Sequence, residues 1–278
     1  MAVVKAQGRT DPFENVETFP RRAGAAVSLG FQPGGSAGPG AEDALPVACI
    51  SRNRLLRALP PEDFALLQPH LSPVTFEQGR SVGDLDQPIE HCYFVESGVI
   101  SMLARSARAR SAEVGLVGPE GMIGVAVVMG DDRSPHETCV QIAGSGVRLP
   151  AERLRRAMAA SPGLQRRLLR YGHALLIQMT HAALANGTAR ITERVSRWIL
   201  MSHDRVGHNE LHLTHDLLSS VLAVRRPGVT DALHELEGRG LIRSTRGQIT
   251  VLDRLGLIAV ADGCYGAPED EYERLMAS

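Results

Sequence analysis

The chain has 278 residues, of which 44% are apolar and 22% charged, and this is enough for two globular domains. Its net charge of −1 at pH 7 excludes an overall basic nucleic-acid binder, so any basic surface must be local. The four cysteines form no CxxC pair, which argues against a zinc ribbon, a thioredoxin motif or a clustered iron–sulfur site. No apolar run approaches a membrane span, and we expect a cytoplasmic protein without a membrane partner.

The first 45 residues are rich in Gly, Ala and Pro and show no sustained hydrophobic period. We expect them to form a disordered leader. Order should begin within Asn53–Leu67, where the apolar residues predict short helices interrupted at Pro60–Pro61.

Short β-type runs recur between His70 and Leu149, separated by glycines and Asp/Pro turns. This pattern is typical of a small all-β barrel or a double-sheet, jelly-roll-like fold. A short helix, Ala151–Ala160, should follow, and we assign residues 46–160 to this β-roll domain. The runs are VTFEQG, CYFVESGVISML, EVGLVG, GVAVVMG, TCVQIAG and GVRLP.

Residues 161–187 predict one long helix that begins at Ser161–Pro162 and ends at Asn186–Gly187. Its apolar residues step by four and three, as in a heptad seam, and a second apolar row widens this face. We expect a homodimer through this helix, the alternative being a core helix within one chain. The expected dimer contacts are Leu168, Tyr171, Leu175, Gln178 and Ala182, and the second row is Leu169, Leu176, Met179 and Ala183.

A second helix should follow, capped by Thr188, with Ile191, Val195, Trp198 and Ile199 on its core face. Gly207–Glu210 reads as a turn and Leu211–Leu213 as a short strand.

The stretch Val221–Ile242, VLAVRRPGVTDALHELEGRGLI, has the pattern of a recognition helix. Thr214 is a good N-cap for the short helix before it, and Pro227 is tolerated in a first turn. Apolar residues at 3/4 spacing (Val229, Ala232, Leu233, Leu236) predict a core face. The open N-terminal tip can then point at base edges and phosphates. We expect DNA contacts from Thr214, Arg225, Arg226, Gly228, Thr230, Asp231 and His234.

Two short β runs around a Thr-Arg-Gly turn follow Gly240 and predict a wing whose Arg243 and Arg246 contact phosphates. Residues 189–254 hold ten arginines and eight carboxylates, a net charge of +2, so the neutrality of the chain conceals a locally basic segment. We assign residues 188–256 to a winged helix-turn-helix domain and residues 257–278 to an acidic C-terminal tail.

This order of parts resembles the Crp/Fnr superfamily of transcription regulators from about Asn53 to Leu252. The hinge NGTARI, the run VLAVRRPGVTDAL and the stretch YFVESGVIS carry the resemblance. It implies an α+β fold with a cyclic-nucleotide-binding-type β roll (a double-stranded β-helix), a dimerisation helix and a winged helix-turn-helix. It also implies a non-enzymatic, sequence-specific regulator whose partners are double-stranded DNA, a second copy and RNA polymerase.

Within this resemblance Arg226 stands at the principal base-reading arginine. Pro227 and Asp231 stand where several members have an acidic and a basic base-contacting residue, so the target sequence cannot be carried over.

The effector pocket departs from the family pattern. Gly124 and Val125 align with the Gly-Glu pair of the phosphate cassette, and His136, followed by Glu137, aligns with its arginine. A cyclic phosphate would therefore lose its bidentate partner, and Leu175 and Leu176 lie near where a base would be. We predict that no cyclic AMP controls the protein and that it has no cofactor. In another register Glu120 supplies the glutamate.

Three alternatives follow from other residues. One is a redox, metal or small-ligand sensor of the same fold that uses Cys92 and Cys139, which lie on predicted strands, or an altered pocket; buried structural thiols are commoner. A cupin-like metal enzyme would need His91, His136 and Glu137, which lack the HxH spacing of such sites. The third alternative is a partner-binding module that no longer recognises DNA, against which the arginines of the helix and wing argue. The four histidines between His203 and His215 read as solvated surface, and no catalytic Ser/His/Asp set is present.

Overall fold

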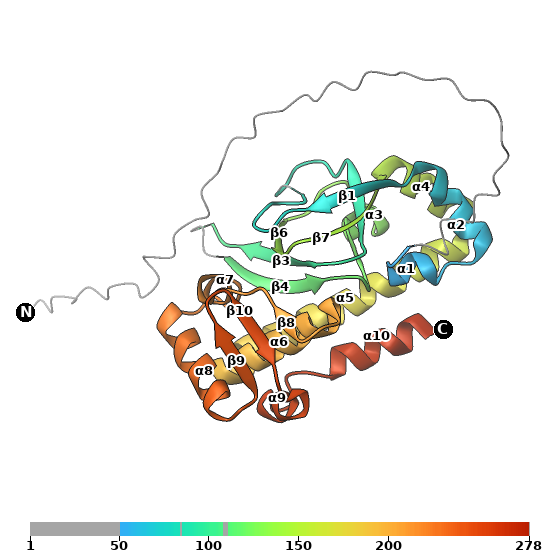
Figure 1. The fold of residues 1–278 in the computed structure, drawn as a ribbon. Helices are drawn as coiled ribbons and strands as arrows, with labels where there is room; N and C mark the ends of the chain where they lie inside the picture. Colours follow the sequence, from blue (N-terminus) through green and yellow to red (C-terminus); the bar gives the residue numbers. More distant parts are fainter. Residues whose placement is uncertain (1–50, 84, 108–110, 278) are drawn as a thin grey trace, which may run out of the picture.

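The computed structural model describes residues 51–83, 85–107 and 111–277. The predicted leader lies outside these ranges. Figure 1 shows a β domain, the long helix α5 running beside it, and a smaller C-terminal domain at the far end of that helix.

Two antiparallel sheets form the β domain, which we call the roll (residues 72–150). Their strand orders are β1-β7-β2-β5 and β4-β3-β6. The predicted β roll and the α+β class are thereby confirmed. The strands are β1 (Ser72–Phe76), β2 (His91–Val95), β3 (Val99–Arg105), β4 (Ser111–Val117), β5 (Met122–Ile123), β6 (His136–Ile142) and β7 (Gly144–Pro150).

Short helices α1 (Arg54–Arg57), α2 (Pro61–Leu67), η2 (Gln68–His70) and α4 (Ala151–Ala160) flank the roll. Helix α2 begins at Pro61, as the Pro60–Pro61 break predicts. Asn53 caps α1 by accepting from the Leu56 amide at 3.1 Å, and its own amide donates to two roll carbonyls at 2.8 Å. This buried side chain fixes the N-terminal helices to the roll.

The prediction of a strand within GVAVVMG is wrong, because Val125–Val128 forms the short helix α3. Gly124 precedes α3 with φ +98°, a left-handed conformation that ends the preceding strand and that glycine adopts readily. The valines have high β propensity, but Val125, Val127 and Val128 are buried in the roll core. Tertiary packing therefore overrides local preference here.

Helix α5 (Pro162–Thr188) is a single helix of 27 residues, capped by the Ser161 hydroxyl. It extends one residue beyond the predicted end. Thr188 is its last residue and donates its hydroxyl to the Leu184 carbonyl at 2.8 Å. The expected cap role of Thr188 is wrong, because the next helix, α6 (Ile191–Val206), begins after Arg190.

The residues of the expected dimer seam contact the roll of the same chain. The side chains of Leu168, Tyr171 and Leu175 belong to the core that α5 shares with the roll of the same chain. Gln178 pairs its amide group with the backbone of Leu116 in β4, at 2.6 and 3.1 Å. Ala182 is likewise buried. Within one chain Leu168, Tyr171, Leu175 and Ala182 are thus buried, and Gln178 is half-buried.

The outer face of α5 carries the exposed apolar residues. Leu169, Leu176 and Leu184 are 42%, 54% and 58% exposed, in contrast to the buried inner row. The two rows are both apolar, so helical period alone could not tell which one meets the roll.

The C-terminal domain contains helix α6 and the predicted helix-turn-helix and wing. Its small sheet has the strand order β8-β10-β9. The predicted core residues Ile199, Val195 and Trp198 are buried in α6. The further elements are β8 (Glu210–Leu211), α7 (His215–Val221), α8 (Arg226–Gly238), β9 (Ile242–Thr245) and β10 (Gln248–Val251).

The segment expected as an acidic tail, residues 257–278, contains the end of one helix and the whole of another. Helix α9 (Arg254–Val260) closes the C-terminal domain, and α10 (Ala267–Ala277) returns to lie beside α5 (Figure 1). Sequence alone did not predict this return.

The roll and the C-terminal domain meet in a common hydrophobic core, in which Val99, Leu116 and Ile142 of the roll pack with the α6–α8 residues. Trp198 is 1% exposed, and its indole nitrogen donates to both carboxylate oxygens of Glu113 at 3.0 and 3.1 Å. The Ser101 hydroxyl also donates to Glu113. A buried carboxyl group therefore bridges β3, β4 and α6.

Burial raises the pKa of Glu113 to about 7, against the opposing effects of the Ser101 and Trp198 hydrogen bonds and of Arg197 and Arg205. The folded chain therefore binds more protons than the unfolded chain between about pH 4.5 and 7. Stability should fall as pH rises through this window, by at most about 3 kcal/mol.

We predict that Glu113→Gln removes this loss, because a glutamine keeps an acceptor for Trp198 and never ionises. In urea unfolding between pH 5 and 8, the variant should gain on the parent as pH rises. Parallel pH profiles for the two proteins would contradict the prediction.

Candidate nucleic-acid interface

Helices α7 and α8 form a helix-turn-helix with a tight connection. The Thr214 hydroxyl accepts from the Leu217 amide at 3.1 Å, which confirms the predicted cap of α7. Ala223 turns the chain with φ +51°, and the Ser219 hydroxyl donates to the Val224 carbonyl at 2.8 Å. The Arg194 guanidinium of α6 donates to the Leu222 carbonyl and so joins the turn to α6.

Helix α8 has the two faces that the sequence predicts. Pro227 lies in its first turn, where a missing amide hydrogen costs no helical bond. Arg225, Arg226, Asp231 and His234 are exposed. The core face consists of Val229, Ala232, Leu233 and Leu236, all buried.

Two expected DNA-contacting residues have other structural roles. A Cβ on Gly228 would lie 3.0 Å from the Ile191 side chain of α6, so glycine permits close packing within the domain and offers DNA only its backbone. The Thr230 hydroxyl lies 3.1 Å from the His215 ring nitrogen Nδ1 and joins α8 to α7.

Arg226 forms an ion pair that the sequence analysis missed. Its guanidinium lies 3.2 Å from the Asp216 carboxylate at the start of α7, and both side chains are largely exposed. Such exposed pairs contribute little stability, so Arg226 can exchange this partner for another acceptor. The two residues are ten positions apart on different helices, beyond the reach of helical spacing rules.

The predicted wing is a hairpin of β9 and β10 in which Thr245 faces Gln248 across a two-residue turn. Gly247 adopts φ +77° in that turn. Arg243 and Arg246 are exposed, and Figure 1 shows this hairpin next to α8. The first turn of α8 and the wing thus both present exposed arginines on the C-terminal domain.

The structure divides the expected effector-pocket residues. Gly124 and Val125 lie where α3 packs on α5, with Val125 buried and 3.5 Å from a Cβ placed on Gly172. His136 begins β6 and is half-buried, and burial lowers its pKa. Leu175 faces β4 at Gly115, whereas Leu176 points outward.

Glu120 is already engaged elsewhere. Its carboxylate lies 2.8 Å from the buried guanidinium of Arg205 in α6 and accepts from the Gly118 amide at 3.2 Å. The alternative register, in which Glu120 would receive an effector, therefore competes with a contact between the roll and α6.

Burial raises the pKa of both expected sensor thiols, to about 12 for Cys92 and about 11 for Cys139. They lie in different sheets, on β2 and β6. Thiols react as thiolates, so these values disfavour redox chemistry at pH 7.

Within residues 51–83, 85–107 and 111–277, no three His, Cys, Asp or Glu side chains are grouped to hold a metal ion. His203 instead contacts Asn209 at 2.9 Å and Arg254 at 3.3 Å. In the same part of the chain no helix is long and apolar enough to span a membrane.

Comparisons with known proteins agree with this geometry. Residues 193–260 match the model of the Crp-like helix-turn-helix domain. The chain is 26% identical over 214 residues to the CRP-like cAMP-activated global transcriptional regulator of Mycobacterium tuberculosis, covering 73% of this chain and 94% of the relative. It is 25% identical over 181 residues to the transcriptional regulator SdrP of Thermus thermophilus, covering 63% and 86%.

Among solved structures, FixK2 from Bradyrhizobium japonicum superposes with a TM-score of 0.61 at 18% identity, covering 68% of this chain and 96% of that one. A putative regulator of the Crp/Fnr family from Eubacterium rectale gives a TM-score of 0.58 at 18% identity, covering 76% and 98%. These likenesses support the fold.

Proposed function

We propose that the chain is a DNA-binding transcriptional regulator of the Crp/Fnr type that reads a two-fold-related operator as a homodimer without control by cyclic AMP. The observation that carries this proposal is the exposed tip of α8, where Arg225 and Arg226 stand beside a first turn. A helix of this kind can enter the major groove with its first turn foremost.

The guanidinium of Arg226 is the group suited to bidentate contact with guanine O6 and N7. In the free chain the carboxylate of Asp216 occupies that guanidinium. The wing arginines Arg243 and Arg246 would contact the phosphate backbone, which fixes register without reading sequence. Action on transcription also implies a contact with RNA polymerase, which belongs to this proposal.

The proposed dimer uses the outer face of α5. Leu169, Leu176 and Leu184 expose apolar surface along this helix, and Met129 at the end of α3 is 61% exposed. A Cβ on Gly172 would lie 3.1 Å from the Met129 side chain, which places that side chain beside α5. Apolar rows of this kind mark association surfaces.

The relative from M. tuberculosis is described as cAMP-activated. In this chain the residues aligned to the cassette are a buried valine and a histidine whose pKa burial lowers. At pH 7 such a histidine is neutral, and a valine accepts no hydrogen bond. The positions therefore offer neither the positive fork for a cyclic phosphate nor the acceptor for a ribose hydroxyl.

We predict that Arg226→Ala weakens operator binding by about 1–3 kcal/mol and relaxes specificity at one base pair per half-site. The operator is first obtained by selection from random duplex DNA, and affinity is then measured by fluorescence anisotropy over a range of salt concentrations. Arg239→Ala is the matched control, because Arg239 lies at the other end of α8 and pairs with Glu235 at 3.7 Å. Parent-like binding by Arg226→Ala would mean that another residue reads the base.

The two faces of α5 predict different outcomes for two substitutions. Leu176→Asp should give monomers in sedimentation, because it places a charge on the proposed interface. Leu168→Ala should leave the dimer intact but reduce the free energy of unfolding by about 2–5 kcal/mol, as for other buried leucines. Dimeric Leu176→Asp protein would move the interface elsewhere.

Calorimetry should detect no micromolar binding of cyclic AMP or cyclic GMP, since each lost charge-assisted contact removes about 1.5–3 kcal/mol. Operator affinity should be unchanged by either nucleotide. Micromolar cyclic AMP binding that also tightens operator binding would overturn the proposed independence. A Glu120→Gln variant would then show whether that carboxylate receives the ligand.

A further inference from the structure

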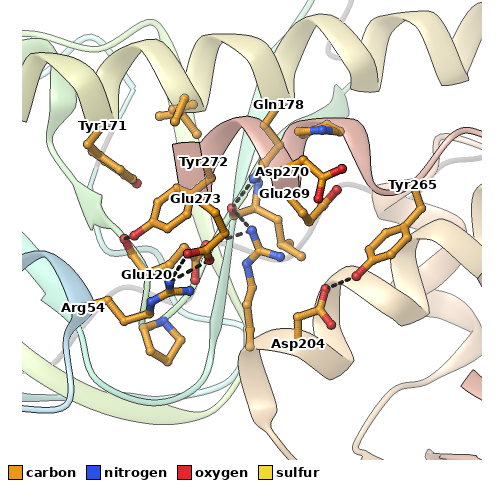
Figure 2. A pocket seen from close by; sticks show the side chains of 16 residues that line it. Arg54, Glu120, Tyr171, Gln178, Asp204, Tyr265, Glu269, Asp270, Tyr272 and Glu273 are labelled. Atoms are coloured by element: carbon orange, nitrogen blue, oxygen red, sulfur yellow. Dashed lines mark hydrogen bonds and ion pairs between the residues drawn. The ribbon is translucent and has the colours of Figure 1, made fainter. Parts of the chain in front are cut away.

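Helix α10 makes specific contacts with the roll side of the molecule, shown in Figure 2. The Tyr272 hydroxyl donates to the Glu120 carbonyl at 2.7 Å. Arg54 binds both carboxylate oxygens of Glu273 at 2.7 and 2.9 Å, and its guanidinium lies 5.1 Å from the centre of the Tyr272 ring. Tyr272 and Met276 also pack against the roll core. Apolar packing, a hydrogen bond and an ion pair therefore hold α10 in place.

The chain leading into α10 is fixed to the C-terminal domain. The Tyr265 hydroxyl donates to the Asp204 carboxylate of α6 at 2.6 Å, as Figure 2 shows. Arg254 of α9 donates to the Tyr265 hydroxyl at 2.6 Å and lies 2.7 Å from the same Asp204. One end of the segment is thus anchored on α6 and the other on the roll.

The same loop of the roll receives both attachments. Glu120 binds Arg205 of α6 through its side chain and Tyr272 of α10 through its carbonyl. The covalent link from α5 to α6 is only two residues long, Ala189 and Arg190. The shared hydrophobic core also joins the two domains. A two-residue link permits rotation unless other contacts restrain it.

The space under α10 is not fully packed. A pocket of about 300 Å³, partly open to solvent, lies between α5, α6, α10 and the Glu120 loop. The Nε of Arg205 is buried beside it without a hydrogen-bond partner in the described structure. A contact that borders a partly open pocket excludes less water than a packed core does, and such regions open at lower free energy.

We propose that α10 is a latch that fixes the orientation of the C-terminal domain on the roll and so determines which half-site spacing the dimer accepts. The match to the Crp-like helix-turn-helix domain ends at residue 260, so α10 lies beyond it. In a symmetric dimer the separation of the two recognition helices must equal the half-site separation along the duplex. A restrained domain permits one separation, and a released domain permits several. The spacing part rests on the proposed function.

The latch is tested first without DNA. Trp198 is the single tryptophan of the chain and lies buried at the contact of α6 with the roll, so its fluorescence reports release of the domain. In the double variant Tyr272→Ala, Met276→Ala we expect red-shifted emission and stronger quenching by acrylamide.

A charge exchange provides the second, gentler test, because Arg54 and Glu273 are exposed and their substitution leaves the core intact. Glu273→Arg should increase the quenching of Trp198 by acrylamide. Adding Arg54→Glu should return the quenching to the level of the parent. Glu271→Gln is the matched control on the same helix, since the ion pair of Glu271 is with Arg274 of α10 itself. Unchanged Trp198 signals in both the double variant and Glu273→Arg would overturn the latch.

The spacing is tested with operators that carry inserted base pairs between the half-sites. Affinity of the parent should fall with each insertion, and affinity of the double variant should fall less. Released Trp198 with an unchanged spacing preference would overturn the spacing role. If the parent binds no selected duplex at all, the proposed function fails, while the fluorescence result still decides whether the latch exists.

Discussion

The burial of Trp198 against Glu113 is the constraint on which the arrangement of the two domains depends. A large indole from α6 and a carboxyl group from β4 are removed from water together, and each satisfies the polar atom of the other. Without Trp198, the buried Glu113 carboxyl group would keep only its hydrogen bond from Ser101. The helix-turn-helix and the wing pack on α6, so this contact contributes to their placement on the roll. Helix α10 adds contacts of its own, through Tyr272 and Glu273.

Local rules predicted the helix-turn-helix well. Caps, a first-turn proline and 3/4 spacing act over a few residues, so Thr214, Pro227 and the α8 core face followed from sequence. The exposed arginines of α8 and the wing followed too, as the positions left over from the core. The pairing of Arg226 with Asp216 and the inward role of Gly228 did not, because both depend on neighbouring helices.

Predictions failed where two surfaces compete for one segment. The valines after Gly124 favour a strand locally, yet their burial against α4 and α5 selects a helix. Helix α5 is apolar on two rows, and only the position of the roll decides that Leu168 turns inward and Leu176 outward. The Tyr272 hydroxyl donates to Glu120, which lies 152 positions away in the sequence. Local sequence patterns cannot predict a contact over such a separation.

The inward row of α5 has a consequence for how the protein is made. Because Leu164, Leu168 and Leu175 fill the chain's own core, we expect a newly synthesised chain to fold before it pairs. Pairing then becomes a second, concentration-dependent step, unlike that of obligate dimers, which have no stable folded monomer. If the proposed dimer forms in this way, folded subunits would exchange between pairs without unfolding. The fraction of the protein able to span two half-sites would then follow its abundance in the cell.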